Sequence, residues 1–142
     1  MISQTAEYAL RAVVYLAMNP SSAFTTKQIA IATRVPPAYL SKVMQLLVKA
    51  NIVRSQRGCG GGFCLVNEPV EICTLDVVNA VDPIQRIEHC PLGIESHGTV
   101  LCALHRKIDD ATAILQRSFA ETSIQDILST PTKSIPLLES LK

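Results

Sequence analysis

The chain lacks the features that would place it in a membrane or make it a small redox enzyme. It has no run of about 18 or more apolar residues, the length that a membrane-spanning helix needs. Its first residues show no basic stretch followed by an apolar one, so we expect a cytoplasmic protein without membrane contact. There is no Cys-x-x-Cys pair, and Gly60-Gly61-Gly62 lacks the Lys-Ser/Thr of a phosphate loop. These absences disfavour a small thiol oxidoreductase, and we expect no enzyme.

Tryptophan is absent and aromatic residues make up only 4% of the chain, yet 48% of its 142 residues are apolar. That share is enough for a packed core, and the length leaves room for one small domain with an appendage. The five cysteines, at positions 59, 64, 73, 90 and 102, form an odd set in a cytosol-like chain. Such usage favours thiols, metal ligands or redox sensing over a disulfide framework.

The near-neutral net charge of +1 hides two halves of opposite sign. Residues 1–67 carry seven Lys or Arg and a single acid, Glu7, which gives this half a charge of +6. Residues 68–142 carry six Lys or Arg and eleven Asp or Glu, which gives −5. A basic N-terminal half on a neutral chain is the electrostatic footprint of phosphate binding.

Residues 25–50 have the pattern of two short helices joined by a tight turn. Thr25 and Gln28 are spaced as in a capping box, which would start the first helix. Arg34-Val35-Pro36-Pro37 interrupts that helix, and Pro37 suits the first position of a second helix over residues 37–50. The inward positions of the second helix are apolar, namely Leu40, Val43, Met44 and Leu47.

A glycine-tipped hairpin follows the second helix. Residues 52–56 and 63–66 have the pattern of two strands, with residues 57–62 as the tip. The sequence therefore predicts a mainly α protein with a small β-hairpin wing, in which residues 1–67 form a winged helix-turn-helix. Similar helix pairs occur in domains that bind only protein, but the basic half favours double-stranded DNA. We expect DNA contacts from Thr26, Lys27, Tyr39, Ser41, Lys42, Gln45, Arg54, Arg57 and Gly61.

Further helices are predicted at residues 5–18, 74–81, 100–120 and 123–128, with Thr74 as the cap of the second. Residues 68–98 would form a linker helix and a Cys-bearing sensor loop, and residues 99–142 a dimerisation helix and tail. The long helix has a heptad-like seam, with Phe119 beside it, formed by Leu101, Leu104, Ile108, Ala111, Leu115 and Ser118. Because the chain has no second long helix to pair with, we expect a homodimer that meets a palindromic site.

Residues 89–105 concentrate two cysteines and three histidines. Cys102 and His105 are three apart on the expected long helix, so they share a face, and Cys90 lies in the loop before it. Thiolates and imidazoles together are able to hold an iron–sulfur cluster. Zinc on Cys90, His97, Cys102 and His105 is a weaker alternative, because the spacing is not that of common zinc modules. Small apolar cysteines and surface histidines would be the plainest interpretation.

The order of these elements, with Arg57-Gly58-x-Gly60-Gly61-Gly62-Phe63 in the wing, resembles the Rrf family of winged-helix transcription regulators, which has IscR, NsrR and CymR types. The resemblance extends from Thr5-Ala6-x-Tyr8-Ala9-Leu10 to about Leu128 and implies a DNA-binding regulator, with repression favoured. Cluster-bearing members have three spaced cysteines and sometimes a histidine. These correspond here to Cys90, Ser96, Cys102 and His105, so the resemblance implies a ligand set without its middle thiolate.

Two residues would complete the ligand set that the resemblance implies. His97 adjoins Ser96, and Glu7 lies where some relatives offer a carboxylate from the partner subunit. The alternative for Glu7 is an ion pair with Arg11 one helical turn away. Two thiolates with histidine or carboxylate partners favour [2Fe-2S] over [4Fe-4S].

Two hypotheses about regulation remain open at the level of the sequence. The leading one is a regulator that senses redox or iron–sulfur status through a Cys/His-ligated cluster. The other is a cluster-free regulator controlled by thiol oxidation or by a protein partner. Cys59 and Cys64 flank the wing tip, where a disulfide between them would change the grip on DNA. Cys73, just before a predicted helix, is expected to be structural.

Overall fold

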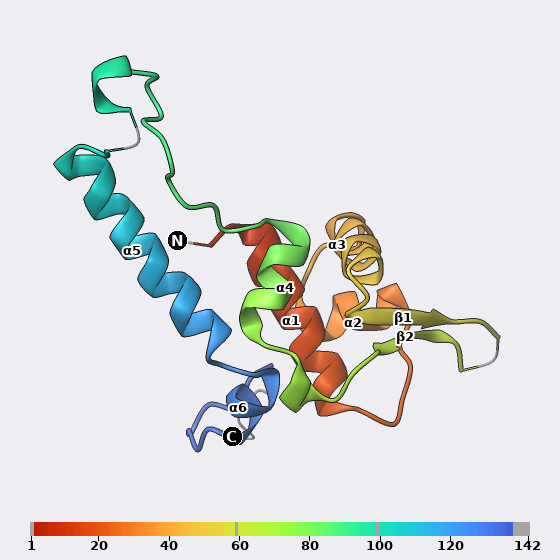
Figure 1. Ribbon diagram of the computed structural model, residues 1–142. Helices are drawn as coiled ribbons and strands as arrows, with labels where there is room; N and C mark the ends of the chain where they lie inside the picture. Colours follow the sequence, from red (N-terminus) through yellow and green to blue (C-terminus); the bar gives the residue numbers. More distant parts are fainter. Residues whose placement is uncertain (1, 59, 99, 138–142) are drawn as a thin grey trace.

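The computed structural model describes residues 2–58, 60–98 and 100–137. The elements follow in chain order as α1 (Gln4–Met18), α2 (Thr26–Thr33), α3 (Pro37–Lys49), β1 (Val53–Gln56), β2 (Gly62–Leu65), η1 (Pro69–Glu71), α4 (Thr74–Val81), η2 (Glu95–His97), α5 (Ala103–Ala120) and α6 (Ile124–Ser129). Helices dominate, and the sheet in the described residues is a two-stranded antiparallel hairpin. The predicted winged helix-turn-helix with a long C-terminal helix is therefore confirmed (Figure 1).

Local interactions determine where the two helices of the helix-turn-helix begin and end. The Thr25 hydroxyl accepts the Gln28 amide at 3.2 Å, and the Gln28 side-chain oxygen accepts the Thr25 amide at 2.9 Å. This reciprocal cap satisfies amides that have no partner inside the helix. Arg34 ends α2 in the left-handed conformation, with φ of 55°, and Pro37 then begins α3 at a position that needs no amide hydrogen.

The wing is tied to the residues that cap α2. Its strands pair with Val53 opposite Leu65 and Gln56 opposite Gly62. The Phe24 amide donates to the Phe63 carbonyl at 3.0 Å, and the Phe63 amide donates to the Phe24 carbonyl at 2.7 Å. The hairpin therefore moves with the start of α2 rather than independently of it.

Helix α1 forms the centre of the core. Ala6, Ala9 and Ala12 are completely buried, and their small side chains let other helices approach closely. α2 and α3 pack on this helix, and so do α4 and α6. The DNA-binding part and the C-terminal part of the chain thus share one buried helix.

Of the C-terminal helices, α5 packs on α4, and α6 packs on α1 and η1. Two backbone hydrogen bonds join the starts of α4 and α6, from the Thr74 amide to the Thr122 carbonyl at 2.9 Å and from the Ile124 amide to the Ile72 carbonyl at 2.8 Å. α5 lies near α4 at its C-terminal end and leads away from the body at its N-terminal end (Figure 1). The residues before α5 project with it, and we call residues 84–108 the arm.

Two predicted details are wrong at single-residue resolution. α5 begins at Ala103 rather than at residue 100, because Cys102 is extended, with φ of −64° and ψ of 166°. Thr74 is the first residue of α4, and Cys73 is the N-cap. The Thr74 hydroxyl does not cap the helix, because it donates to the Phe119 carbonyl at 2.7 Å. That hydroxyl makes a tertiary contact between α4 and the end of α5. None of the helices within the described residues has the length and apolar character needed to cross a membrane.

We expect Gly62→Ala to loosen the wing. Gly62 has φ of 141°, and a Cβ at this position would lie 2.3 Å from the Phe24 carbonyl oxygen. The clash must break the bridge to Phe24, so the free energy of unfolding should fall by about 2–4 kcal/mol in chemical denaturation. Gly60→Ala is the control, because Gly60 also has a positive φ but nothing lies near its Cβ position. Equal losses for the two variants would contradict the steric explanation.

Candidate functional site

The outer face of α3 presents polar side chains to solvent. Leu40, Val43, Met44 and Leu47 are buried on the opposite face, which orients the helix. Tyr39 is 64% exposed, and Ser41, Lys42 and Gln45 are exposed beside it. The apolar spacing therefore leaves four of the predicted DNA contacts on the accessible side of one helix.

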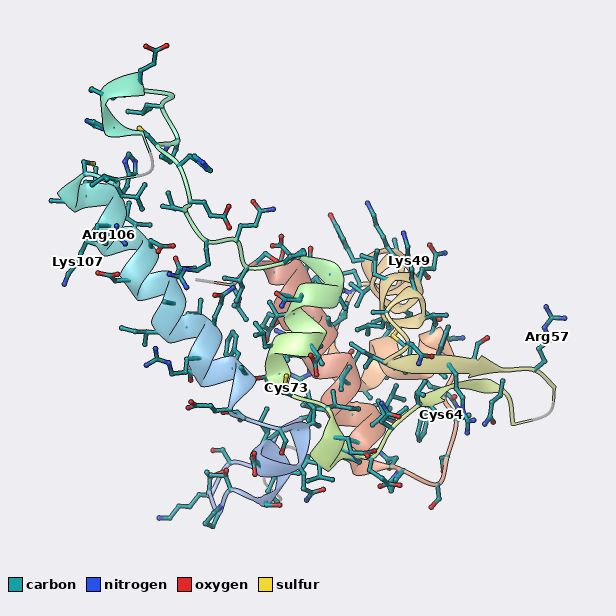
Figure 2. All side chains as sticks on the ribbon, viewed as in Figure 1. Lys49, Arg57, Cys64, Cys73, Arg106 and Lys107 are labelled. Carbon is teal, nitrogen blue, oxygen red and sulfur yellow. The ribbon has the colours of Figure 1, made fainter. Side chains whose placement is uncertain are left out.

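The remaining predicted contacts flank α3. Thr26 and Lys27 occupy the first turn of α2, where Thr26 is half-buried and Lys27 exposed. Arg54 is exposed on β1, and Arg57 extends from the wing into solvent, while Lys49 lies in the last turn of α3 (Figure 2). Gly61 is half-buried. The Gln56 carbonyl comes so close that a Cβ at this position would lie 2.7 Å from its oxygen. Its role is to let the tip turn.

Cys64 lies opposite Arg54 in the hairpin. The Arg54 side chain donates to the Cys64 sulfur at 3.2 Å, and the Gln56 amide lies 3.5 Å from the same sulfur. The predicted disulfide partner, Cys59, lies outside the described residues. Cys64 is therefore joined to an arginine that was predicted to contact DNA.

Arg11 connects α1 to both helices of the helix-turn-helix. Its guanidinium pairs with Glu7 at 2.8 Å and donates to the Thr33 carbonyl, at the end of α2, at 3.2 Å. It also lies over the Tyr8 ring at 5.4 Å, and that ring is 6.4 Å from the ring of Tyr39. The ion pair considered for Glu7 is present, whereas the contacts to Thr33 and Tyr8 were not predicted.

The arm brings one predicted ligand pair together. Cys102, the residue before α5, has its sulfur 3.4 Å from Nδ1 of His105. Nδ1 of His97 is shielded from solvent and has no hydrogen-bond partner in the described structure. Cys90 is half-buried in the preceding loop. Among the described residues, however, no three Cys, His, Asp or Glu side chains gather as a metal site.

Cys73 lies away from the arm. It forms an isolated β-bridge with Ser123, and burial raises the pKa of its thiol above the ordinary value of 9.0. A thiol with a raised pKa stays protonated and unreactive at neutral pH. This environment agrees with the predicted structural role.

The base of the arm is held by a buried carboxylate that sequence reasoning missed. Asp109, on α5, is 4% exposed and accepts two hydrogen bonds from Arg86, each of 2.7 Å. The Ile87 amide adds a third at 2.9 Å. The Arg86 hydrogen bonds, with help from the Ile87 amide, lower the pKa of Asp109 from 3.8 to about 2. We call this arrangement the Arg86–Asp109 clasp.

A signal for the clasp was present in the sequence. Asp109, Thr112 and Gln116 recur at steps of three and four, which places polar side chains on one helical face. Gln116 donates to the Ile84 carbonyl at 3.0 Å, so this face grips the start of the arm. The apolar seam lies on another face, where Leu104 and Ile108 are 65% and 46% exposed. The prediction that Leu101 belongs to this seam is wrong, because Leu101 is buried and precedes the first residue of α5, Ala103.

Comparison with known proteins shows the family of this chain. A family model for Rrf2, described as an iron-dependent transcriptional regulator, matches residues 2–130. The chain belongs to the Rrf2 family. It is 30% identical over 138 residues to an HTH-type transcriptional regulator assigned in Aquifex aeolicus, covering 95% of this chain and 96% of the relative. The Rrf2-family chain is therefore a DNA-binding transcriptional regulator.

Solved structures support the fold of this Rrf2-family regulator. CymR, the global cysteine regulator of B. subtilis, is 25% identical, with a TM-score of 0.70 over 89% of this chain and 95% of CymR. IscR of T. potens has a TM-score of 0.74 at 20% identity, over 90% of this chain and 85% of that protein. Both neighbours share the mainly helical architecture with a wing.

We expect the Arg86–Asp109 clasp to respond to acid. A carboxylate with a lowered pKa contributes stability above about pH 4, and this contribution is lost as the pH falls towards 2. Arg86→Gln should return the pKa of Asp109 towards 3.8, as measured by carboxyl NMR titration. Arg117→Gln, a change on the same helix outside the clasp, should leave it low. An Asp109 pKa near 3.8 in the unsubstituted protein would contradict the clasp.

Proposed function

We propose that this Rrf2-family protein is a homodimeric repressor that binds a palindromic operator and senses redox or iron–sulfur status. The observation that carries the proposal is the Cys102–His105 pair, which lies on the same arm as His97, whose Nδ1 has no hydrogen-bond partner among the described residues. In this proposal residues 1–67 bind DNA, residues 68–98 sense the signal and residues 99–142 make the dimer.

The proposed DNA interface follows from exposure and charge. α3 enters the major groove with Tyr39, Ser41, Lys42 and Gln45, which are the exposed polar residues of that helix. Arg57, at the wing, lines the minor groove, and Arg54 with the first turn of α2 meets the backbone. The exposed Lys and Arg residues of the N-terminal half, a set that leaves out Arg11, neutralise phosphates at both half-sites.

The proposed dimer interface is the apolar seam of α5. Leu104 and Ile108 are exposed to solvent in the single chain, and the neighbouring Ile114 is 66% exposed. Burying such side chains against a second copy removes apolar surface from water, which favours association. Helix α5, on which these side chains lie, projects from the body at its N-terminal end (Figure 1), so two copies can pair there without disturbing the core.

The donors of the arm fit a small cluster. Cys90, Cys102 and His105 supply two thiolates and one imidazole, and His97 or Glu7 of a second subunit supplies the fourth ligand. The buried Nδ1 of His97 supports this fit, because a shielded nitrogen without a partner is costly unless something occupies it. A [2Fe-2S] cluster suits two thiolates better than a [4Fe-4S] cluster, and zinc is the weaker alternative. When bound, the cluster would supply a one-electron redox centre.

Glu7 offers a route from the arm to the DNA interface. A carboxylate that serves as a ligand cannot keep its full ion pair with Arg11. The hydrogen bond from Arg11 to the Thr33 carbonyl and its contact with the Tyr8 ring would then change. The Tyr8 ring lies next to Tyr39 of α3. Ligation by Glu7 would therefore change the position of α2 and α3 relative to α1.

A cluster-free regulator is the second candidate. The contact between Arg54 and Cys64 supports it, because oxidation of that sulfur would disturb an arginine of the proposed DNA interface. Control by a protein partner is the other cluster-free mechanism. The visible spectrum of protein purified without oxygen distinguishes these two cluster-free mechanisms from sensing through a cluster.

We expect Lys42→Ala and Arg57→Ala to weaken operator binding. Each substitution removes one phosphate contact per subunit, so the slope of log affinity against log salt should fall by about 2 in the dimer. Fluorescence anisotropy over a salt series measures the slope. Lys133→Ala, an exposed lysine after α6, is the matched control. Unchanged affinity in the Lys42→Ala, Arg57→Ala double variant would refute this placement of DNA.

We expect Leu104→Glu and Ile108→Glu to give folded monomers. Both side chains are exposed in the single chain, so the charge is unfavourable only when a second copy buries it. Sedimentation gives the mass, and circular dichroism checks the helices. Val70→Glu, on the exposed face of η1, should leave a dimer. A dimer that persists in both α5 variants would place the interface elsewhere.

We expect anaerobically purified protein to be coloured and to contain iron and acid-labile sulfide. Cys90→Ala or Cys102→Ala should bleach it, because each removes one of two thiolates, and His105→Ala should leave a labile cluster or none. Cys59→Ala, Cys64→Ala and Cys73→Ala should keep the colour. Only the true fourth ligand should shift the absorption when Glu7→Ala and His97→Ala are compared. Colourless, iron-free protein after anaerobic reconstitution would leave the cluster-free regulator.

A further inference from the structure

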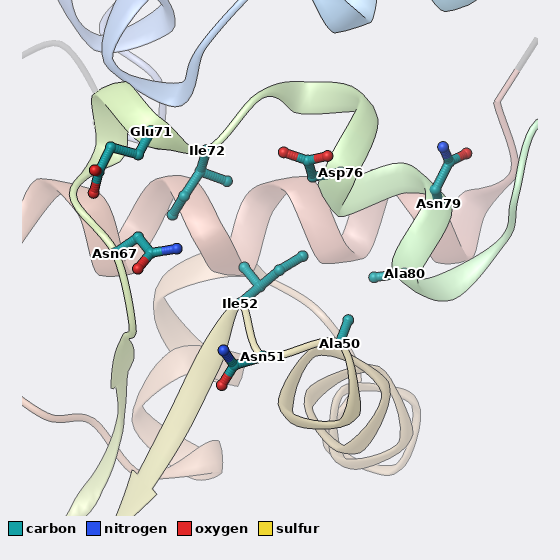
Figure 3. Close-up of a pocket in the computed structure, with 9 residues that line it drawn as sticks. All are labelled: Ala50, Asn51, Ile52, Asn67, Glu71, Ile72, Asp76, Asn79 and Ala80. Carbon is teal, nitrogen blue, oxygen red and sulfur yellow. The ribbon is translucent and has the colours of Figure 1, made fainter.

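A pocket of about 430 Å³ lies between the DNA-binding part and α4 (Figure 3). Its walls come from the end of α3, the residues that flank the wing, η1 and α4. The volume falls within the usual range for small-molecule sites. None of the residues of the proposed sensor, from Cys90 to His105, lines it.

The pocket combines an apolar floor with a polar rim. Ile52 and Ile72 are buried and lie between the polar lining residues (Figure 3). Asn51, Asn67 and Asn79 contribute amide groups around the edge. Such a combination suits a ligand with a hydrocarbon segment and terminal hydrogen-bonding groups.

Two carboxylates give the pocket its charge. Glu71 and Asp76 lie on either side of Ile72 (Figure 3), and none of the nine described lining residues is basic. One oxygen of Glu71 accepts the Glu68 amide, and one oxygen of Asp76 accepts the Cys73 amide, both at 3.2 Å. These two contacts hold the carboxylates at the edge of the pocket, where both side chains are exposed.

We propose that this pocket binds a small aliphatic diamine. The two ammonium groups pair with Glu71 and Asp76, and the methylene chain between them covers Ile52 and Ile72. A bare divalent metal is disfavoured, because no three Cys, His, Asp or Glu side chains converge in the described structure. The site goes beyond the proposed cluster sensor, since it uses neither the cysteines nor the histidines of the arm.

The position of the pocket gives the ligand a regulatory role. Asn51 and Asn67 belong to the segments that flank the wing strands, whereas Asp76 and Asn79 belong to α4. The side-chain oxygen of Asn79 also accepts the Ile84 amide, at the start of the arm, at 3.1 Å. A diamine that spans the pocket would therefore hold the DNA-binding part and the arm in one arrangement, and would stabilise the folded state.

The test is an NMR titration of the free protein with 1,5-diaminopentane at constant ionic strength. We expect saturable shifts at Asn51, Asn67 and Asn79, with a dissociation constant of about 1 mM, because exposed ion pairs are weak. Glu71→Gln with Asp76→Asn should weaken binding about tenfold, since both ion pairs are lost while the side-chain oxygens still accept the backbone amides. Glu121→Gln removes one acid outside the pocket and should bind as the unsubstituted protein does.

A second variant and two further probes keep the result unambiguous. Ala50→Leu adds bulk at an exposed residue of the rim and should also weaken binding, without any change of charge. Equal binding of 1-pentanol, or stronger binding of Ca²⁺ at the same residues, would overturn the proposal. So would undiminished binding by the double variant, or the absence of saturable shifts. Because no DNA or iron is present, these outcomes are independent of the cluster hypothesis.

Discussion

The burial of α1 is the constraint on which the rest of the structure depends. Ala6, Ala9 and Ala12 have no exposed surface, and their small side chains allow helices to approach α1 from several directions. α2 and α3 of the DNA-binding part pack on it, and α4 and α6 of the C-terminal part do the same. A shift of α1 must therefore displace both the DNA-binding part and the C-terminal part, because a close-packed interior transmits displacement.

Arg11 gives that mechanical connection a polar component. It joins Glu7 to the end of α2 and lies against the tyrosine pair that leads to α3. On the other side of the molecule, the Arg86–Asp109 clasp holds the base of the arm to α5 through a buried carboxylate. Asp109 is buried while Arg86 is partly exposed, and hydrogen bonds from Arg86 and the Ile87 amide to this one carboxylate fix the base of the arm to α5.

The two halves of the chain also differ in electrostatic character. The N-terminal half, with a charge of +6, carries the winged helix, while the acidic half carries the arm and both carboxylates of the pocket beside α4. A negatively charged DNA duplex is attracted to the first half and repelled by the second, which favours one orientation of binding. A positively charged ligand near η1 and α4 would reduce that repulsion on the acidic side.

The sequence by itself determined the elements whose stabilising contacts are local. The Thr25–Gln28 capping box, Pro37 at the start of α3 and the glycines of the wing each act within a few residues, so their patterns predict structure directly. Cys102 and His105, three residues apart, lie together, but Cys102 precedes α5 and is not on the shared helical face that the sequence predicts.

Only the tertiary structure decided the contacts that join distant segments. Arg11 and Thr33 are 22 residues apart, and Arg86 and Asp109 are 23 apart, so no local pattern specifies either pairing. The hydroxyl of Thr74 was predicted to cap a helix, yet it donates to Phe119, 45 residues away. The pocket beside α4 has the same origin, because its walls meet only after the helices have packed around α1.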